Sequence, residues 1–143
     1  MFHRVAALAA GVLLVASQLA AAQNTALYQL QERCGKSAAE VFAKEYANGT
    51  SARVGDSEIY FGYEAHYNAK LNKCFYLEKT QTYDFNKKSV TSGFRLYDIH
   101  ENKEIGGFGG VHPALGVVDC QVNGERCRSE DEWRALAKPY LEE

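Results

Sequence analysis

Proline and excess charge of either sign are both scarce in this chain of 143 residues, which has two prolines and a net charge of −2. Hydrophobic residues make up 46% of the chain and charged residues 24%, a balance that argues against a disordered, collagen-like or repeat-built protein. The small net charge gives no basis for phosphate-backbone binding or for a polybasic membrane anchor. We therefore expect one globular domain that does not bind nucleic acid.

An apolar run at the N-terminus, from Val5 to Ala20, follows the positive charge of Arg4 and precedes small residues up to Ala22. This order is typical of a secretory signal peptide and predicts cleavage before Gln23. A membrane anchor is the alternative, but the run is near or below the roughly 17 to 25 residues that a spanning helix needs. We expect residues 1–22 to be a signal peptide, residues 23–143 to be a single secreted or periplasmic domain, and no membrane span after cleavage.

Four cysteines follow the expected cleavage site, and an even number in an exported chain predicts two disulfides; they are Cys34, Cys74, Cys120 and Cys127. Asn123-Gly124 favours a type I′ hairpin turn that places Cys120 opposite Cys127, within the span of a disulfide. Cys34 is then left to pair with Cys74. A metal or redox site is the alternative, but the sequence has neither a C-x-x-C motif nor a paired Cys/His spacing.

Hydrophobic periodicity predicts a long amphipathic helix and then a series of strands. Apolar residues recur at helical intervals over residues 25–47, and Asn48-Gly49 suits the helix end. The period changes to two over residues 63–71, which indicates a strand with one face in water. Further strands are expected at residues 74–85, 90–99 and 104–108, joined by short turns that favour an antiparallel meander.

The C-terminal third has looser signals. Residues 109–116 show no clear period and predict a flexible loop, and the glycines of residues 106–110 fit strand ends or bulges better than a phosphate-binding loop. Ser129 and Glu132 form a capping box for a last helix, which Pro139 should end. The expected class is α+β: a long N-terminal helix packed on an antiparallel β-meander of about four strands, a disulfide-closed hairpin and a short C-terminal helix.

Two segments carry a recognisable pattern. The first is Tyr67-Asn68-Ala69-Lys70-Leu71-Asn72-Lys73-Cys74-Phe75, and the second runs from Cys120 through Asn123-Gly124, Cys127, Ser129 and Glu132-Trp133 to Lys138-Pro139-Tyr140. Both resemble segments of small exported bacterial proteins of no known activity. The resemblance spans most of residues 23–143 and implies no activity.

Three histidines are the candidates for catalysis, and three acidic residues could orient them: His66, His100 and His112, with Glu64, Asp98 and Glu101. No nucleophile stands at a recognisable spacing from them, and no two histidines have metal-ligand spacing. We therefore expect surface histidines and assign no catalytic, cofactor or metal residue. The nine tyrosines could supply contacts for a partner, but half-buried strand positions are the favoured interpretation.

Ser92-Gly93-Phe94-Arg95-Leu96-Tyr97 looks like the Ser-Gly-x-x-Tyr loop of periplasmic lysozyme inhibitors, with one residue too many before the tyrosine. In a strand, that extra residue turns Tyr97 to the opposite face, so the loop is not carried over. We expect a non-enzymatic binding module without a cofactor, whose partner is a protein in the cell envelope or outside the cell. The alternatives are a small secreted hydrolase that uses a surface histidine, and an inhibitor of a cell-wall hydrolase.

Overall fold

A computed structural model describes residues 6–113 and 115–142, with side chains from Gln23 onward. The chain divides into two compact units, Met1–Arg33 and Cys34–Glu143. Helix α1 (Ala6–Glu45) begins in the first unit and ends in the second. Within the expected signal peptide, residues 1–5 lie outside the described residues, and the backbone from residue 6 onward belongs to this helix.

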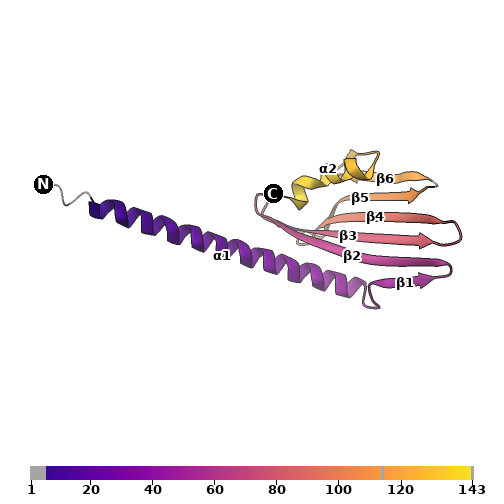
Figure 1. The fold of residues 1–143 in the computed structure, drawn as a ribbon, viewed down its shortest axis with the longest axis horizontal. Helices are drawn as coiled ribbons and strands as arrows, with labels where there is room; N and C mark the ends of the chain where they lie inside the picture. Colours follow the sequence, from indigo (N-terminus) through magenta and orange to yellow (C-terminus); the bar gives the residue numbers. More distant parts are fainter. Residues whose placement is uncertain (1–5, 114, 143) are drawn as a thin grey trace. The chain divides into compact units, whose positions relative to one another are not determined.

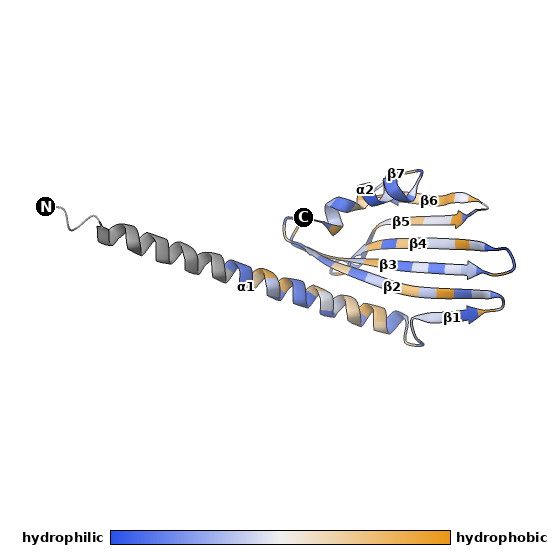
Figure 2. Ribbon diagram, viewed as in Figure 1, coloured by the Kyte–Doolittle hydropathy of each residue, from blue (hydrophilic) through white to orange (hydrophobic). Residues whose placement is uncertain are grey.

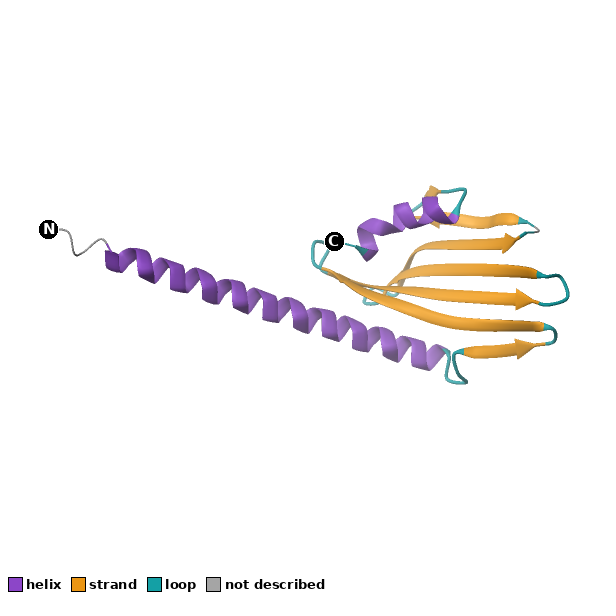
Figure 3. Cartoon of the chain, viewed as in Figure 1, coloured by secondary structure: helices purple, strands orange, loops and turns teal. Residues whose placement is uncertain are grey.

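One antiparallel sheet of seven strands, in chain order, forms the body of the second unit (Figure 1). Short turns join neighbouring strands, as Figure 3 shows, and helix α2 follows the last of them. The elements are β1 (Ser51–Val54), β2 (Ser57–Asn68), β3 (Lys73–Asp84), β4 (Ser89–Asp98), β5 (Lys103–His112), β6 (Gly116–Val122), β7 (Glu125–Arg126) and α2 (Glu130–Leu141).

Both predicted disulfides are confirmed. Asn123 and Gly124 have φ angles of 50° and 84°, as a type I′ turn requires. Cys120 and Cys127 therefore lie opposite each other, with Cα atoms 5.0 Å apart. The second bridge joins Cys34 on α1 to Cys74 on β3 across a Cα distance of 5.4 Å, and it attaches the end of the helix to the sheet.

Each face of the sheet packs against one helix. Hydrophobic and hydrophilic residues are interspersed along the strands (Figure 2), because successive side chains point to opposite faces. On β3, Phe75 and Leu77 belong to the main hydrophobic core with Trp133 of α2, which we call the α2 face. Cys74 and Tyr76 point to the opposite side, the α1 face. Residues 74–78 are all buried as a result.

Aromatic rings attach the last turns of α1 to its face of the sheet. The ring centroid of Phe42 lies 4.7 Å from that of Tyr63, and the ring of Tyr46 stacks on Phe61 at 4.3 Å. Rings at these separations contribute about 0.5 to 1.5 kcal/mol beyond their buried area. Phe42 and Tyr46, which the helical period places on the apolar stripe, therefore contact β2.

The expected count of about four strands is wrong, although the α+β class is confirmed: the meander has seven strands. Strand β1 was missed because all four of its residues are exposed, so no alternation of apolar and polar residues marks it. Strand β6 begins at Gly116, before the hairpin cysteine, and β5 extends to His112 through the first half of the expected flexible loop. Backbone pairing with neighbouring strands, rather than side-chain pattern, forms these segments.

Two further expectations are corrected at α2. Helix α2 passes through Pro139 to Leu141, because a proline in the last turns removes only one hydrogen bond and the amide of Glu142 still donates to the Lys138 carbonyl. The main buried core lies under this short helix, whereas the sequence predicted that the long N-terminal helix would cover it. The predicted capping box is present: the Ser129 hydroxyl accepts a hydrogen bond from the Glu132 amide at 3.1 Å.

Candidate functional site

The three histidines lie on different parts of the sheet. His66 is on β2 opposite Phe75, and His100 is in the turn between β4 and β5. His112 is the last residue of β5, at the end of the strand that is far from this turn. His66 was expected on a wet face, but it is half-buried, and its Nε2 atom has no hydrogen-bond partner among the described residues. The histidines therefore do not form one catalytic centre.

The carboxylates that could have oriented a histidine are engaged elsewhere. Lys73 Nζ lies 2.8 Å from Asp98 Oδ2 and 2.7 Å from Glu101 Oε1. Asp98 Oδ1 also accepts the backbone N–H groups of His100 and Glu101. Burial alone would raise the pKa of Asp98, but the Lys73 ammonium and these amides bring it below its usual value. Glu64 in turn pairs with Lys79.

The segment on which the resemblance rests has structural roles in the fold. Asn68 is buried, and its side chain donates to the Pro139 carbonyl at 2.9 Å and accepts from the Leu71 amide at 2.9 Å. The Tyr67 hydroxyl donates to Asn72 at 2.6 Å. These bonds fix the β2–β3 turn and tie it to α2.

Neither the Ser92–Tyr97 segment nor the glycines of residues 106–110 forms a loop. The first lies within β4 and the second within β5. A Cβ atom on Gly106 would come within 2.5 Å of the Gln121 carbonyl oxygen, so the close approach of β6 requires glycine there. The glycines are strand residues, and the register shift at Gly109/Gly110 fits the predicted bulge, whereas the loop expected from residue 109 onward is wrong at these two positions.

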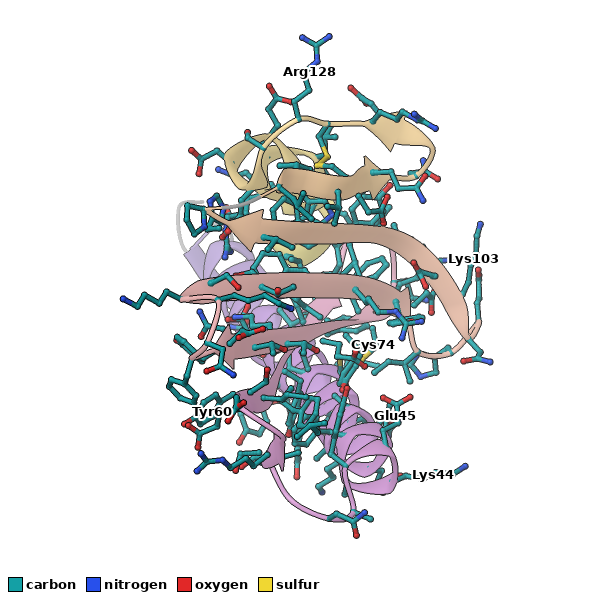
Figure 4. The ribbon with its side chains drawn as sticks, turned by 90° about the vertical axis from the view of Figure 1, so that its right-hand side faces the viewer. Lys44, Glu45, Tyr60, Cys74, Lys103 and Arg128 are labelled. Atoms are coloured by element: carbon teal, nitrogen blue, oxygen red, sulfur yellow. A yellow bond between two sulfur atoms is a disulfide. The ribbon has the colours of Figure 1, made fainter. Side chains whose placement is uncertain are left out.

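A cavity of about 220 Å³ lies between the end of α1 and the sheet. We call it the Tyr76 cavity; it is lined by Val41 and Glu45 of α1, Tyr76 of β3, Arg95, Tyr97 and Asp98 of β4, and Ile99 and Asn102 of the following turn. In Figure 4, Lys44 extends away from the sheet next to Glu45 on the same helix. All the lining residues belong to the second unit.

Tyr76 is the most deeply buried polar residue of this cavity after Asp98. Only 1% of its surface is exposed, and its hydroxyl has no hydrogen-bond partner in the described part of the chain. Burial, followed by the nearby carboxylates of Glu78 and Glu45, raises the pKa of this phenol well above its usual value. The hydroxyl is therefore neutral, and its capacity as hydrogen-bond donor and acceptor is unused in the described part of the chain.

Glu78 lies beside Tyr76 on the α1 face and is 6% exposed. Its carboxyl accepts a hydrogen bond from the Tyr46 hydroxyl and lies within hydrogen-bonding reach of the Glu45 carboxyl. Burial is the main cause that raises the pKa of Glu78, and the Glu45 carboxyl adds to it. Burial and the Glu78 charge raise the pKa of Tyr46 to about 12. Tyr46 and Glu78 are therefore coupled under the last turn of α1.

Arg95 supplies the cation of the site. Its guanidinium lies 4.9 Å from the centroid of the Tyr97 ring and forms an ion pair with Glu104 at 3.2 Å. Its Nη1 atom is 4.0 Å from Glu78. Burial raises the pKa of Tyr97 to about 12, so its ring stays neutral beneath the cation.

A second hollow, of about 250 Å³, shares Arg95 with the Tyr76 cavity. We call it the glycine trough, because Gly93, Gly107 and Gly109 line it together with Glu78, Thr80, Phe94, Arg95, Glu104, Phe108 and Asp119. A Cβ atom on Gly107 would lie 3.4 Å from Asp119 Oδ2 and 3.6 Å from Glu104 Oε1. Two carboxylates therefore converge over bare backbone.

Sequence reasoning missed this site because its polar residues come from α1 and from four strands, with no fixed spacing between them. The abundance of tyrosine was the available signal, since Tyr46, Tyr76 and Tyr97 meet here. No group of three or more His, Cys, Asp or Glu side chains that could hold a metal ion occurs in residues 23–113 and 115–142. None of the helices that the structure describes is long and apolar enough to cross a membrane.

Comparisons with family models, with curated protein sequences and with solved structures gave no match to this chain.

Proposed function

We propose that the chain is an exported, non-enzymatic binding module that acts in the periplasm or outside the cell and holds part of its partner in the Tyr76 cavity. We also propose that the chain is related to the small exported bacterial proteins that its sequence resembles. Two disulfides support an oxidising compartment. The apolar N-terminal run that precedes Gln23 supports export.

The observation that carries the proposal is the Tyr76 hydroxyl, which is buried without a protein partner beside an accessible cavity. A buried polar group left unpaired costs about 1 to 3 kcal/mol. A ligand that hydrogen bonds to this hydroxyl recovers that free energy on binding. The neighbouring Arg95 and Glu45 add charged groups that orient such a ligand.

Binding is favoured over hydrolysis because the residues that a hydrolase would use are separated or engaged. Asp98 and Glu101, the carboxylates that flank His100 in sequence, are held by Lys73, while His66 lies on β2 and His112 on β5. An inhibitor of a cell-wall hydrolase would need an inserting loop, and the Ser92–Tyr97 segment that suggested one is part of β4.

The test is an NMR titration of the ¹⁵N-labelled, disulfide-bonded protein with envelope extract separated into small solutes, glycans and proteins. We expect one fraction to shift the backbone amides of Tyr76, Arg95 and Tyr97. Tyr76→Phe should weaken the effect, and Tyr83→Phe, which removes a hydroxyl from the α2 face of the same strand, should leave it intact. Shifts confined to other surfaces, or no shift with any fraction, would refute the proposed site.

A further inference from the structure

Carboxylates outnumber cations around the two adjoining hollows. Glu45 lines the Tyr76 cavity, and Glu78, Glu104 and Asp119 line the glycine trough. Arg95 is the one Lys or Arg side chain among the lining residues of both hollows, and Glu104 already pairs with it at 3.2 Å. The carboxylates of Glu45 and Asp119 also line accessible space, and their negative charge favours a positively charged ligand.

The glycines make room for such a ligand. Because Gly107 has no side chain, the Asp119 and Glu104 carboxylates reach over its backbone, 3.4 Å and 3.6 Å from where a Cβ atom would stand. The nearest atoms to a Cβ on Gly93 are 3.9 Å away, so the floor beside Arg95 is also open. The trough is thus a polar surface whose acceptors stand above bare main chain.

The Tyr76 hydroxyl is an independent observation that points to the same ligand. It is buried, unpaired and part of the cavity wall. Its oxygen has two acceptor lone pairs, and an ammonium group has three N–H donors and no acceptor. Hydrogen bonds to a charged group are roughly twice as strong as those between neutral groups. An ammonium group therefore gains more binding free energy from this hydroxyl than a neutral donor does.

We propose that the Tyr76 cavity and the glycine trough bind a primary ammonium group, carried either by a lysine side chain or by an amino sugar. This assignment rests on the proposed binding function and specifies the chemistry of its ligand. An anionic ligand would meet the carboxylates at close range, and a neutral one would leave their charge unpaired.

The pH dependence of ammonium binding is set by the titratable and charged groups that surround Glu45 and Glu78. They are Tyr46 directly after α1, Tyr63 of β2, Tyr76 of β3, Arg95 and Tyr97 of β4, Glu104 of β5 and Asp119 of β6. Burial raises the pKa of Glu78 above its usual value. An ammonium group competes with the proton on this carboxyl, so the affinity for an ammonium ligand should increase as the pH rises and Glu78 loses its proton.

The probes are two ammonium compounds and their neutral counterparts, titrated into the ¹⁵N-labelled protein with both disulfides formed. N-acetyl-lysine methylamide is compared with N-acetyl-norleucine methylamide, and glucosamine with N-acetylglucosamine. We expect at least one ammonium probe to shift the amides of Tyr76, Arg95 and Tyr97 with an affinity about tenfold above that of its neutral counterpart, and more tightly at higher pH. The tighter of the two identifies the source of the ammonium group.

Tyr76→Phe should weaken binding of the ammonium probe about tenfold, whereas Tyr83→Phe should not change it. The fold of each variant is checked from its amide spectrum without ligand. Equal binding of the neutral probes, or tighter binding of N-acetyl-aspartate at the same amides, would overturn the ammonium assignment and leave the binding site standing. If an envelope fraction shifts these amides but neither ammonium probe does, the ammonium assignment is likewise overturned and the binding site stands. No shift at these amides with any probe or fraction would overturn both proposals.

Discussion

Two tyrosines under the end of α1 differ in whether their hydroxyls are paired, and this difference should be measurable as stability. Tyr46 donates to the buried carboxyl of Glu78, whereas the hydroxyl of Tyr76 has no partner in the described residues. Tyr46→Phe should therefore lower the free energy of unfolding by about 1 to 3 kcal/mol, because it leaves Glu78 without its donor.

Tyr76→Phe should leave the free energy of unfolding unchanged or raise it by about 1 kcal/mol, because it removes a polar group that was buried without a bond. Urea unfolding of both variants, beside the wild-type protein at pH 7, makes the comparison. A Tyr76→Phe variant as unstable as Tyr46→Phe would show that the Tyr76 hydroxyl is paired after all.

The buried carboxyl of Glu78 should make stability depend on pH with an unusual sign. Burial raises its pKa in the folded state above the value of about 4.3 that a glutamate has in an unfolded chain. The folded protein then binds more protons than the unfolded one, so this residue's contribution is full below pH 4 and is lost as the pH rises through the folded pKa.

Glu78→Gln should abolish that part of the pH dependence. The free energy of unfolding of the variant relative to wild type should therefore increase between pH 4 and pH 7. Asp98, whose pKa is lowered, has the opposite sign and is present in both proteins, so it cancels from the difference. A constant difference across this range would contradict the raised pKa.

At the scale of elements, the two disulfides should contribute unequally. Cys34–Cys74 closes a segment with a sequence separation of 40 and joins α1 to the sheet, whereas Cys120–Cys127 has a separation of 7 within one hairpin. On the chain-entropy account the longer loop contributes about 4 kcal/mol and the shorter about 2.5 kcal/mol.

Replacing both Cys34 and Cys74 by Ala should cost about 2 to 5 kcal/mol and also increase hydrogen exchange in residues 34–45. The hairpin variant, with Cys120 and Cys127 replaced by Ala, is the matched control and should leave exchange in those residues unchanged. Equal exchange in the two variants would show that aromatic packing alone holds α1 on the sheet.

For the whole molecule, the export hypothesis predicts where the chain begins in its native host. N-terminal sequencing of the protein recovered from outside the cytoplasm should start at or within a few residues of Gln23. The purified protein should also contain no free thiols, since both disulfides form in an oxidising compartment. An intact Met1 on exported protein would contradict the signal-peptide interpretation.

The sequence by itself determined the local features of this protein. The Asn123-Gly124 turn set the Cys120–Cys127 pairing, and the capping box set the start of α2, because both depend on backbone geometry within a few residues. Helical and strand periods located the end of α1 and the cores of β2, β3 and β4. No longer-range information was needed for these predictions.

Only the tertiary structure decided the number of strands, the two covered faces and the site. Strand β1 has no apolar pattern and forms because its backbone pairs with that of β2. Side-chain periodicity cannot predict such pairing. Glu45, Tyr76 and Arg95 are 19 to 50 residues apart in sequence, and they meet because helix packing and strand register bring one face of three elements together. Such a site depends on long-range packing, so no spacing in the chain could have revealed it.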